Sequence, residues 1–376
     1  MKNRFGKIVI FALLSISLAL FAVGNGFAED KIILGVAGPH SGDLASYGIP
    51  TVRAAELVVA DINAKGGVLG KQIEIMAEDD VCKPEIATNT ANKMISSGVK
   101  IVLGHICSGA TKAALGAYKS EKVIALSPSA TNPALTQSGD YPNFFRTIAS
   151  DDAQAKLEVE FALETLKVKK IAVIHDKGDY GKGLAEFAKQ FVEASGKGEV
   201  VLYEGVTPGA VDYSAVVQKI KRSEAEAVIF GGYHPEASKI VTQMKKKKVE
   251  AVFISDDGVK DDTFIKVAGE FAEGVYATGP KDVTKNPLSI KAAEEHKAKY
   301  NEDYGAFYLN AYAGALALLA AVQNAGSLDY DAIVNALRTK EVETPLGSIK
   351  FDEKGDAIGV GFSMYQVKDG AYVEVQ

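Results

Sequence analysis

Cysteine is scarce in this sequence: Cys82 and Cys107 are the two among 376 residues. A metal centre built on them would need a histidine or further cysteine close by, and His105 is the histidine that lies near in sequence. In an oxidising compartment two such cysteines favour a disulfide, while a metal pair or a nucleophilic thiol remains an alternative. The low cysteine content therefore points to one covalent cross-link at most.

Long apolar runs are equally scarce, and the one present is Ile8–Val23. Basic residues precede it and Gly26-Phe27-Ala28 follows, which is the pattern of a secretory signal peptide cleaved after Ala28. The run is short for a membrane span, and the lack of cysteine near the cut argues against a lipid anchor. We therefore predict that residues 1–28 are a cleaved signal peptide and that the protein acts in the periplasm.

Positive charge is not in excess, since 42 lysines and arginines face 48 aspartates and glutamates and give a net charge of −6. The predicted leader carries three basic and no acidic residues, so its removal would change the net charge from −6 to −9. This balance argues against nucleic acid and against anionic membrane surfaces as partners. The remaining 376 − 28 = 348 residues suit two α/β domains better than one.

Motifs for catalysis and cofactor binding are also lacking. There is no Gly-x-Ser-x-Gly elbow, and the glycine-rich segment 178–183 lacks the order of a phosphate or dinucleotide loop. His105, His175 and His234 lie near predicted strand ends, but their spacing fits no metal-ligand pattern. We therefore predict no metal, no cofactor and no enzymatic activity. A hydrolase with Ser108 as nucleophile and His105 as base remains an alternative, although no third group is identifiable.

What the sequence does contain is an alternation of β-branched strands with helix-forming segments, which predicts parallel sheets covered by helices on both faces. The alternation pauses near residues 146–151, restarts, and continues to about residue 255. After Gly279-Pro280 the segments are mainly helical and too poor in strands for a third lobe. The last section must complete the other two lobes, so the chain crosses between them repeatedly, and repeated crossings predict a hinge over a cleft.

Polar turns follow strands in both predicted lobes, and ligands of parallel sheets bind at these strand ends. In the first lobe the mouth is lined by Ser108, Ser129, Ala130 and Thr131. Ser108 lies where a helix begins, and the unpaired N–H groups and positive dipole there favour an anion.

The corresponding turns of the second lobe supply Tyr180 and Tyr233 together with the carboxylates Asp256 and Asp257. One lobe thus suits an anion and the other a cation and an apolar body, which is the chemistry of an amino acid with a hydrocarbon side chain. Each residue has a plainer structural interpretation: Ser108 as a helix cap, Asp257 as a turn residue and the tyrosines as packing at the rim.

Several motifs occur together and in order. They are Ala60–Gly67, Gly104–Ser108, Pro128–Thr131, His175–Leu184, Gly231–Glu236 and Asp352–Asp356. With them the chain resembles, over essentially all of its length after residue 28, the periplasmic leucine/isoleucine/valine-binding proteins of ABC transport. The resemblance implies an α/β fold of type I, with two doubly wound parallel-sheet lobes joined by a three-crossing hinge near Ser150, Pro280 and Phe362. The lobes would be residues 29–149 with 281–361, and residues 150–280 with 362–376.

The resemblance also implies a role for single residues. Ser108 and Thr131 would bind the α-carboxylate, while the Ser129 carbonyl, the Thr131 hydroxyl and Asp257 would bind the ammonium. The residues placed around the ligand side chain would be Tyr47, Ile106, Cys107, Tyr180, Tyr233 and Phe307, and Cys82 would pair with Cys107. One departure is Asp257, because the family usually has glutamate there; the shorter side chain would weaken the ammonium contact, admit a water or suit a different ligand.

The sequence therefore predicts a non-catalytic, monomeric receptor that captures an aliphatic, branched-chain L-amino acid in the periplasm. We expect it to deliver this ligand to the permease and ATPase of an ABC transporter in the inner membrane. Two alternatives remain open. The protein could report the ligand to a signalling partner, or it could bind a different small amino acid such as alanine or a γ-amino acid.

Overall fold

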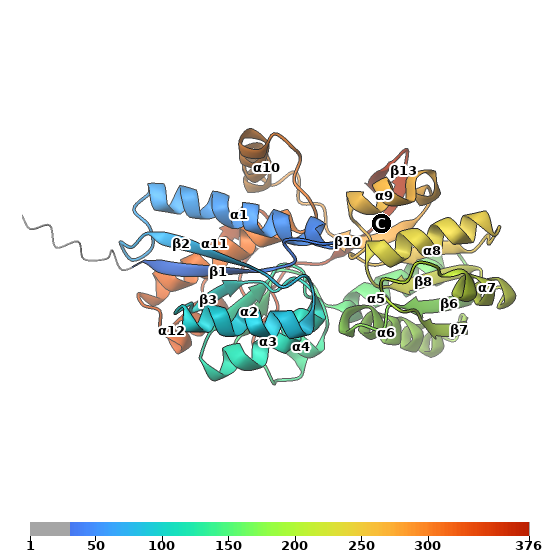
Figure 1. Cartoon of the computed structure of the whole chain (residues 1–376), viewed down its shortest axis with the longest axis horizontal. Coiled ribbons are helices and arrows are strands. Elements are labelled where there is room, and N and C mark those ends of the chain that lie inside the picture. Colours follow the sequence, from blue (N-terminus) through green and yellow to red (C-terminus); the bar gives the residue numbers. More distant parts are fainter. Residues whose placement is uncertain (1–30, 376) are drawn as a thin grey trace, which may run out of the picture. The chain divides into compact units, whose positions relative to one another are not determined.

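The computed structural model describes residues 31–375, so the predicted signal peptide lies outside the described residues. Within this part of the chain the strands form a five-stranded sheet, a seven-stranded sheet and a two-stranded ribbon (Figure 1). The first sheet has the order β2-β1-β3-β4-β5, and all its strands are parallel. Its strands are β1 Ile32–Gly38, β2 Ile73–Asp79, β3 Ile101–Leu103, β4 Ile124–Ser127 and β5 Phe144–Arg146.

The second sheet has the order β14-β13-β10-β9-β8-β6-β7. Strands β6 to β10 are mutually parallel, whereas β13 and β14 are antiparallel additions at one edge. The strands are β6 Lys170–His175, β7 Glu199–Gly205, β8 Ala227–Gly231, β9 Val252–Ser255, β10 Tyr276–Pro280, β13 Phe362–Lys368 and β14 Ala371–Glu374. The ribbon pairs β11 Val342–Thr344 with β12 Gly347–Ile349. The alternating pattern from Ile358 to Val375 predicted strands where β13 and β14 lie, whereas β5, β10 and β11 were not predicted, because short strands leave little periodicity to recognise.

Helices cover both faces of each sheet, as the alternation predicted. Their bounds are α1 Ala45–Ala64, α2 Pro84–Ser96, α3 Ser108–Ser120, α4 Ala134–Gln137, α5 Asp151–Glu160, α6 Asp179–Ser195, α7 Ser214–Arg222, α8 His234–Lys246, α9 Asp262–Ala268, α10 Pro287–Tyr300, α11 Tyr308–Ala325 and α12 Tyr330–Thr339. Short helical turns follow α5 at Phe161–Thr165 and α9 at Gly269–Ala272.

Alternate residues along each buried strand pack into separate cores. In β8, Val228 and Phe230 join the core beneath α7, α8 and α9, while Ala227 and Ile229 join the core beneath α5 and α6. In the first sheet, Leu103 faces α1 and α11, whereas Val102 faces α2 and α3. Side chains of a strand point alternately to its two faces, so a strand covered on both sides must be apolar throughout.

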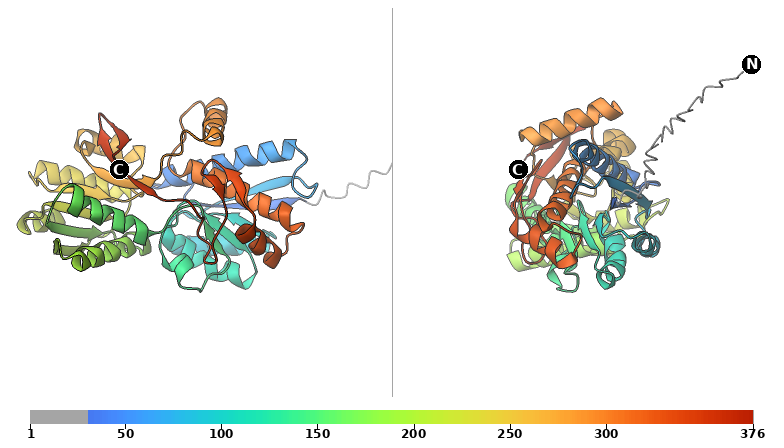
Figure 2. Two further views of the ribbon diagram at one scale, coloured as in Figure 1. Left: turned by 180° about the vertical axis from the view of Figure 1, so that it is seen from behind. Right: turned by 90° about the vertical axis from the view of Figure 1, so that its left-hand side faces the viewer.

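Helix α11 is buried nearly all round and packs on the first sheet, which Figure 2 shows from behind. A helix that is apolar on every side is expected to lie inside a core. Among residues 31–375, no single helix is long and apolar enough to span a membrane; α11 and α12 pass such a test together but bend by 116° at their junction.

The chain passes between the two sheets three times. It leaves the first sheet after β5, returns after β10 and crosses again before β13. These passages lie where the resemblance implied a three-crossing hinge. The boundaries of the lobes themselves stay a prediction.

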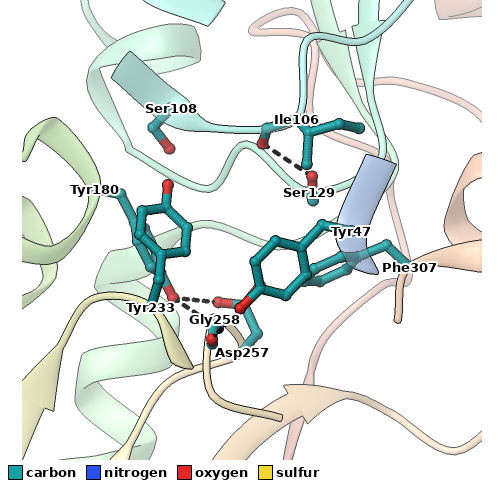
Figure 3. Close-up of a pocket in the computed structure, with 9 residues that line it drawn as sticks. All are labelled: Tyr47, Ile106, Ser108, Ser129, Tyr180, Tyr233, Asp257, Gly258 and Phe307. Carbon is teal, nitrogen blue, oxygen red and sulfur yellow. Dashed lines mark hydrogen bonds between the residues drawn. The ribbon is translucent and has the colours of Figure 1, made fainter. Parts of the chain in front are cut away.

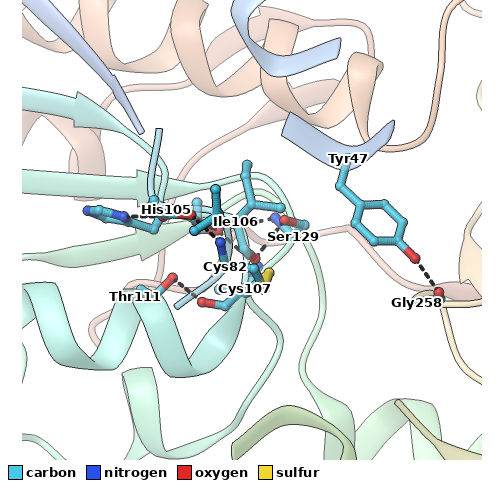
Figure 4. The surroundings of a disulfide bond; sticks show 12 residues. Tyr47, Cys82, His105, Ile106, Cys107, Thr111, Ser129 and Gly258 are labelled. Carbon is cyan, nitrogen blue, oxygen red and sulfur yellow. Dashed lines mark hydrogen bonds and ion pairs between the residues drawn. A yellow bond between two sulfur atoms is a disulfide. The ribbon is translucent and has the colours of Figure 1, made fainter. Parts of the chain in front are cut away.

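The predicted disulfide is confirmed: Cys82, in the turn after β2, is bonded to Cys107, the residue before α3 (Figure 4). The two Cα atoms lie 5.6 Å apart and the cysteines are 25 residues apart in sequence. The bond joins two turns at the carboxyl end of the first sheet. It also rules out the alternatives of a metal pair and a nucleophilic thiol for the oxidised protein.

Removing this bond with the double substitution Cys82→Ala/Cys107→Ala is expected to lower the free energy of unfolding by about 3–4 kcal/mol, the chain-entropy value for a loop of this length. Urea unfolding of both proteins, with and without dithiothreitol, measures the effect. The reductant should destabilise the parent protein and leave the double variant unchanged. A loss below about 1 kcal/mol would show that the loop is held by its other contacts.

Candidate ligand-binding site

A small pocket lies between the carboxyl ends of the two sheets, with ≈ 250 Å³ of empty space including its opening to solvent (Figure 3). Its lining residues are Tyr47, Ile106, Ser108, Ser129, Tyr180, Tyr233, Asp257, Gly258 and Phe307. Eight of these nine are predicted site residues, and Gly258 is the addition. Ala130, Thr131 and Cys107 do not line the cavity, although Cys107 lines a neighbouring groove, so their contact with a ligand stays a prediction.

Ser108 is the first residue of α3, directly after the turn that follows β3. Cys107 is the capping residue, and its side chain makes no cap hydrogen bond within the described chain. The Ser108 hydroxyl instead accepts a hydrogen bond of 3.2 Å from the backbone N–H of Asn132. Ser108 is therefore not the helix cap of the plainer interpretation. The first N–H groups of α3 remain without a side-chain partner in the described residues, beside the pocket.

The second turn of this side is held by hydrogen bonds that point Ser129 away from the cavity centre. The Ser129 hydroxyl donates to the carbonyl of Ile106 at 2.9 Å (Figure 4). Ser127 accepts from the N–H of Ala130 at 2.9 Å and donates to the carbonyl of His105 at 2.5 Å. Since the Ser129 hydroxyl is already engaged, its backbone is the part of this residue that remains for a ligand.

Arg146 organises this turn, and the sequence analysis did not single it out. It is fully buried and its guanidinium donates to the carbonyls of Ala130, Thr131 and Asn132 at 3.3, 2.7 and 3.1 Å. Its Nε also pairs with Oδ1 of Asp356 at 2.5 Å. One planar cation thus fixes three successive carbonyls of this turn, two of which belong to the predicted site residues Ala130 and Thr131. The sequence offered one signal for its burial: Arg146 follows two phenylalanines in the short buried strand β5.

On the opposite side Asp257 follows β9 and is 2% exposed. Its Oδ1 accepts hydrogen bonds from the Tyr180 hydroxyl at 2.5 Å and from Nε2 of Gln154 at 3.0 Å. Its buried Oδ2 has no hydrogen-bond partner among residues 31–375. Burial raises the pKa of this carboxyl to about 6. A buried carboxylate oxygen without a partner is not the mark of an ordinary turn residue, and it suits a cation.

Aromatic rings close the pocket between the two polar ends. The ring of Tyr233 lies 5.1 Å from that of Tyr180 and 6.0 Å from that of Tyr47, and Phe307 lies 5.8 Å from Tyr47. Figure 3 shows the hydroxyl of Tyr233 pointing toward Ser108. Burial raises the pKa of Tyr47, Tyr180 and Tyr233, so these phenols stay protonated and act as neutral hydrogen-bonding groups.

Tyr47 also bridges the two sides of the pocket, because its hydroxyl donates to the carbonyl of Gly258 at 2.5 Å. It belongs to α1, which packs on the first sheet, while Gly258 follows β9 of the second. Local sequence patterns did not predict Tyr47 and Phe307 as site residues; the family resemblance did. Tyr47 lies in the first turn of α1, after the glycine-containing turn that follows β1, and Phe307 lies directly before α11.

The hydrolase alternative lacks its base. His105 is fully buried, with Nδ1 2.6 Å from Oδ2 of Asp80 and Nε2 3.0 Å from the Tyr118 hydroxyl. Both ring nitrogens are thus occupied away from Ser108. Among residues 31–375 no group of three or more histidine, cysteine or acidic side chains is arranged to hold a metal ion.

The carboxyl ends of the two sheets enclose one small pocket, which has a charged end, a hydroxyl-rich end and apolar walls. This arrangement is that of a solute-binding protein. The sequence profile of the family described as "Periplasmic binding protein" matches residues 31–371. The chain therefore belongs to the periplasmic binding protein family.

Two relatives show which branch it is similar to. The leucine-, isoleucine-, valine-, threonine- and alanine-binding protein of Pseudomonas aeruginosa is 38% identical, with 96% of each chain aligned. The Leu/Ile/Val-binding protein of Escherichia coli K12 is 36% identical, with 94% of this chain and 95% of the relative aligned.

Solved structures agree in fold. The leucine-binding protein LivK of Thermotoga maritima has a TM-score of 0.86 at 26% identity, covering 92% of this chain and 98% of its own. A second structure is LivJ of Streptococcus pneumoniae, a branched-chain amino acid transporter substrate-binding protein in complex with isoleucine. Its TM-score is 0.79 at 30% identity, and the match covers 92% of this chain and 100% of LivJ. A type 1 periplasmic binding protein of Bordetella pertussis has a TM-score of 0.84 at 24% identity, covering 92% and 100%, which supports the type I fold.

Proposed function

We propose that this protein is a non-catalytic receptor that binds an aliphatic L-amino acid in the periplasm and delivers it to the permease and ATPase of an ABC transporter. The observation that carries the proposal is the pairing of two ends across one pocket: an uncapped helix start at Ser108 and a free, buried Oδ2 of Asp257. The named specificities of the relatives support it. The protein would be exported by a cleaved signal peptide and act as a monomer without a cofactor.

The α-carboxylate of the ligand would bind at the start of α3. The Ser108 hydroxyl and the first N–H groups of the helix supply donors, and the helix dipole is positive at this end. The Tyr233 hydroxyl, which points toward Ser108, would add a donor from the opposite side. A carboxylate that accepts hydrogen bonds from both sides would favour the closed arrangement of the pocket.

The ammonium of the ligand would bind Oδ2 of Asp257 and the carbonyl of Ser129. Tyr180 and Gln154 hold the other carboxylate oxygen, so Oδ2 is oriented before the ligand arrives. A charge-assisted N–H···O bond in a site without water is stronger than one between neutral groups.

The hydrocarbon side chain would pack against Ile106, Tyr47 and Phe307. Full burial of one Leu or Ile side chain contributes about 1.5–3 kcal/mol, enough to favour an aliphatic ligand over glycine. The pocket is small and is lined by nine residues, which suits a single amino acid and not a peptide.

Titration calorimetry of the purified protein tests the proposal with leucine, isoleucine, valine, alanine and γ-aminobutyrate. We expect one-to-one binding of at least one α-amino acid with an aliphatic side chain. If γ-aminobutyrate were the only one of the five to bind, the ligand class would be γ-amino acids and not α-amino acids. A folded sample that gives no heat with any of the five would contradict the proposal. Uptake in cells lacking this protein separates delivery to a permease from signalling.

The double substitution Ser108→Ala/Thr131→Ala is expected to weaken the binding of leucine by about a hundredfold or more, because each hydrogen bond to a charged group contributes about 1.5–3 kcal/mol. The matched control is Thr88→Ala/Ser120→Ala, which removes two hydroxyls that bond to helix carbonyls away from the pocket. The control should bind leucine like the parent. Unchanged affinity in the Ser108/Thr131 variant would overturn the assignment of the carboxylate site.

A further inference from the structure

Four carboxyl groups lie together beside the pocket, and we call them the hinge carboxyl cluster: Asp151, Glu158, Asp256 and Asp257. Asp151 and Glu158 belong to α5, which begins where the chain first passes to the second sheet. Asp256 and Asp257 follow β9. The first three are fully buried and Asp257 is 2% exposed. Only Asp257 lines the cavity.

Each member of the cluster has at least one oxygen without a partner. Within the described part of the chain, both carboxyl oxygens of Asp151, Oε2 of Glu158, Oδ1 of Asp256 and Oδ2 of Asp257 are buried and make no hydrogen bond of normal geometry. The fully buried Thr131 hydroxyl lies beside Asp151 and also lacks a hydrogen bond of normal geometry to any described residue. Four ionised carboxylates so close together in a buried site would repel one another strongly, so they cannot all be charged.

The surroundings supply little positive charge. Of the described residues, Arg146 is the cation that acts on the cluster, and its guanidinium is committed to three carbonyls and to Asp356. The other titratable groups that interact with the cluster from neighbouring elements are Asp152, Tyr47, Tyr180, Tyr233 and Tyr372. Aspartates add negative charge and buried phenols add none. The buried Lys260 faces another set, Asp261, Asp262, Asp282 and Glu374.

A chain of hydrogen bonds connects the interior of the cluster to the pocket. The Thr278 hydroxyl donates to Oε1 of Glu158 at 3.0 Å. Gln154 donates through Nε2 to Thr278 at 2.8 Å and to Oδ1 of Asp257 at 3.0 Å. A change of charge at Asp257 is therefore felt at Glu158 through two buried, neutral side chains.

We propose that ligand binding displaces a proton from the hinge carboxyl cluster, because the ammonium of the ligand replaces that proton as the neutralising charge at Asp257. The proton passes to solvent, the ammonium keeps its own three protons, and no covalent bond of the ligand changes. This inference rests on the proposed function, since it needs a ligand with a cationic end. It makes amino-acid capture sensitive to the pH of the periplasm.

The electrostatics of the cluster supports the proposal and gives the direction in which affinity should change with pH. Burial, with the neighbouring carboxyls, raises the pKa of Asp151 and Asp256, and burial raises those of Glu158 and of Asp257, the last to about 6. Above that pH the free Asp257 is ionised and affinity should be flat. Below it each unit of pH should cost about tenfold in affinity for each proton displaced. An unperturbed aspartate would keep the affinity constant down to about pH 4.

Calorimetry of L-leucine binding in phosphate and in imidazole, buffers of low and high ionisation enthalpy, counts the protons directly. At about pH 6 the observed enthalpy should differ between the buffers by an amount equivalent to about half a proton released, or more, and at about pH 8 by much less. Neither end of free leucine titrates between pH 5 and 7. The inference would be overturned if the binding enthalpy at pH 6 did not depend on the buffer and the affinity did not change between pH 5 and pH 8. A complete lack of binding would instead overturn the proposed function.

Glu158→Gln tests whether the cluster acts as a unit at a distance from the ligand. Glutamine keeps the oxygen that accepts from Thr278 and removes the share of the cluster's proton and negative charge that Glu158 carries. The pH below which affinity falls should move down by about 0.5–1 unit. The control is Glu160→Gln, two residues along the same helix, which is exposed and paired with Lys156. An equal pH profile for both variants would show that Glu158 does not share the proton.

Discussion

Asp257→Asn should weaken the binding of leucine by about a hundredfold or more, which would be the largest effect of any single substitution in the pocket. Removing one partner of a buried, hydrogen-bonded charge pair costs about 2–5 kcal/mol. Asparagine keeps the carbonyl oxygen that accepts from Tyr180 and Gln154, so the variant should fold as before. The free Oδ2 is replaced by an amide group, which repels an ammonium. The effect should appear in the dissociation rate more than in the association rate.

Calorimetry and stopped-flow fluorescence of the variant measure this loss. Asp262→Asn is the control, because this carboxyl lies five residues along the chain, is exposed and begins α9. Asp257→Glu preserves the charge and lengthens the side chain by one methylene, and it should retain most of the affinity. If Asp257→Asn bound leucine within about threefold of the parent affinity, the proposal that the ammonium binds at Asp257 would be contradicted.

Arg146→Met should lower the free energy of unfolding by about 3–5 kcal/mol, the range for breaking a buried ion pair from one side. The substitution removes the donors to the carbonyls of Ala130, Thr131 and Asn132 and leaves them buried. It also leaves Asp356 without its guanidinium partner. Because the same carbonyls shape the turn of the predicted carboxylate site, leucine binding should weaken as well.

Urea unfolding followed by far-ultraviolet circular dichroism gives the stability of this variant. Arg222→Met, at the exposed end of α7, is the matched control and should change stability by less than about 0.5 kcal/mol. A midpoint for Arg146→Met equal to that of the control would mean that water replaces the guanidinium without loss.

Local pattern was sufficient for the elements that are regular and apolar. The strands around Val102 and Ile229 and the helix around Leu318 could be predicted, since a segment buried on both faces has to be apolar throughout. Ser108 could also be predicted as a site residue, because a hydroxyl at a strand-to-helix turn is a local feature. The same holds for Asp257 and the tyrosines at strand ends.

The contacts that complete the site were beyond such a pattern. Tyr47 meets Gly258 across 211 residues, and Arg146 meets Asp356 across 210. Nothing in the neighbourhood of either residue in sequence marks its partner. A family resemblance supplied Tyr47 and Phe307, but Gly258, Gln154 and the hinge carboxyl cluster emerged from the packing.

The sequence by itself determined which regular apolar segments become strands and helices and which turns are polar, because these depend on residues a few positions apart. Tertiary structure decided that Oδ2 of Asp257 is free while Oδ1 is engaged, and that four carboxyls share one buried site. The physical reason is that burial and hydrogen-bond satisfaction are properties of surroundings assembled from distant segments. The charge state of a side chain, and with it the chemistry of this pocket, is fixed when those segments meet.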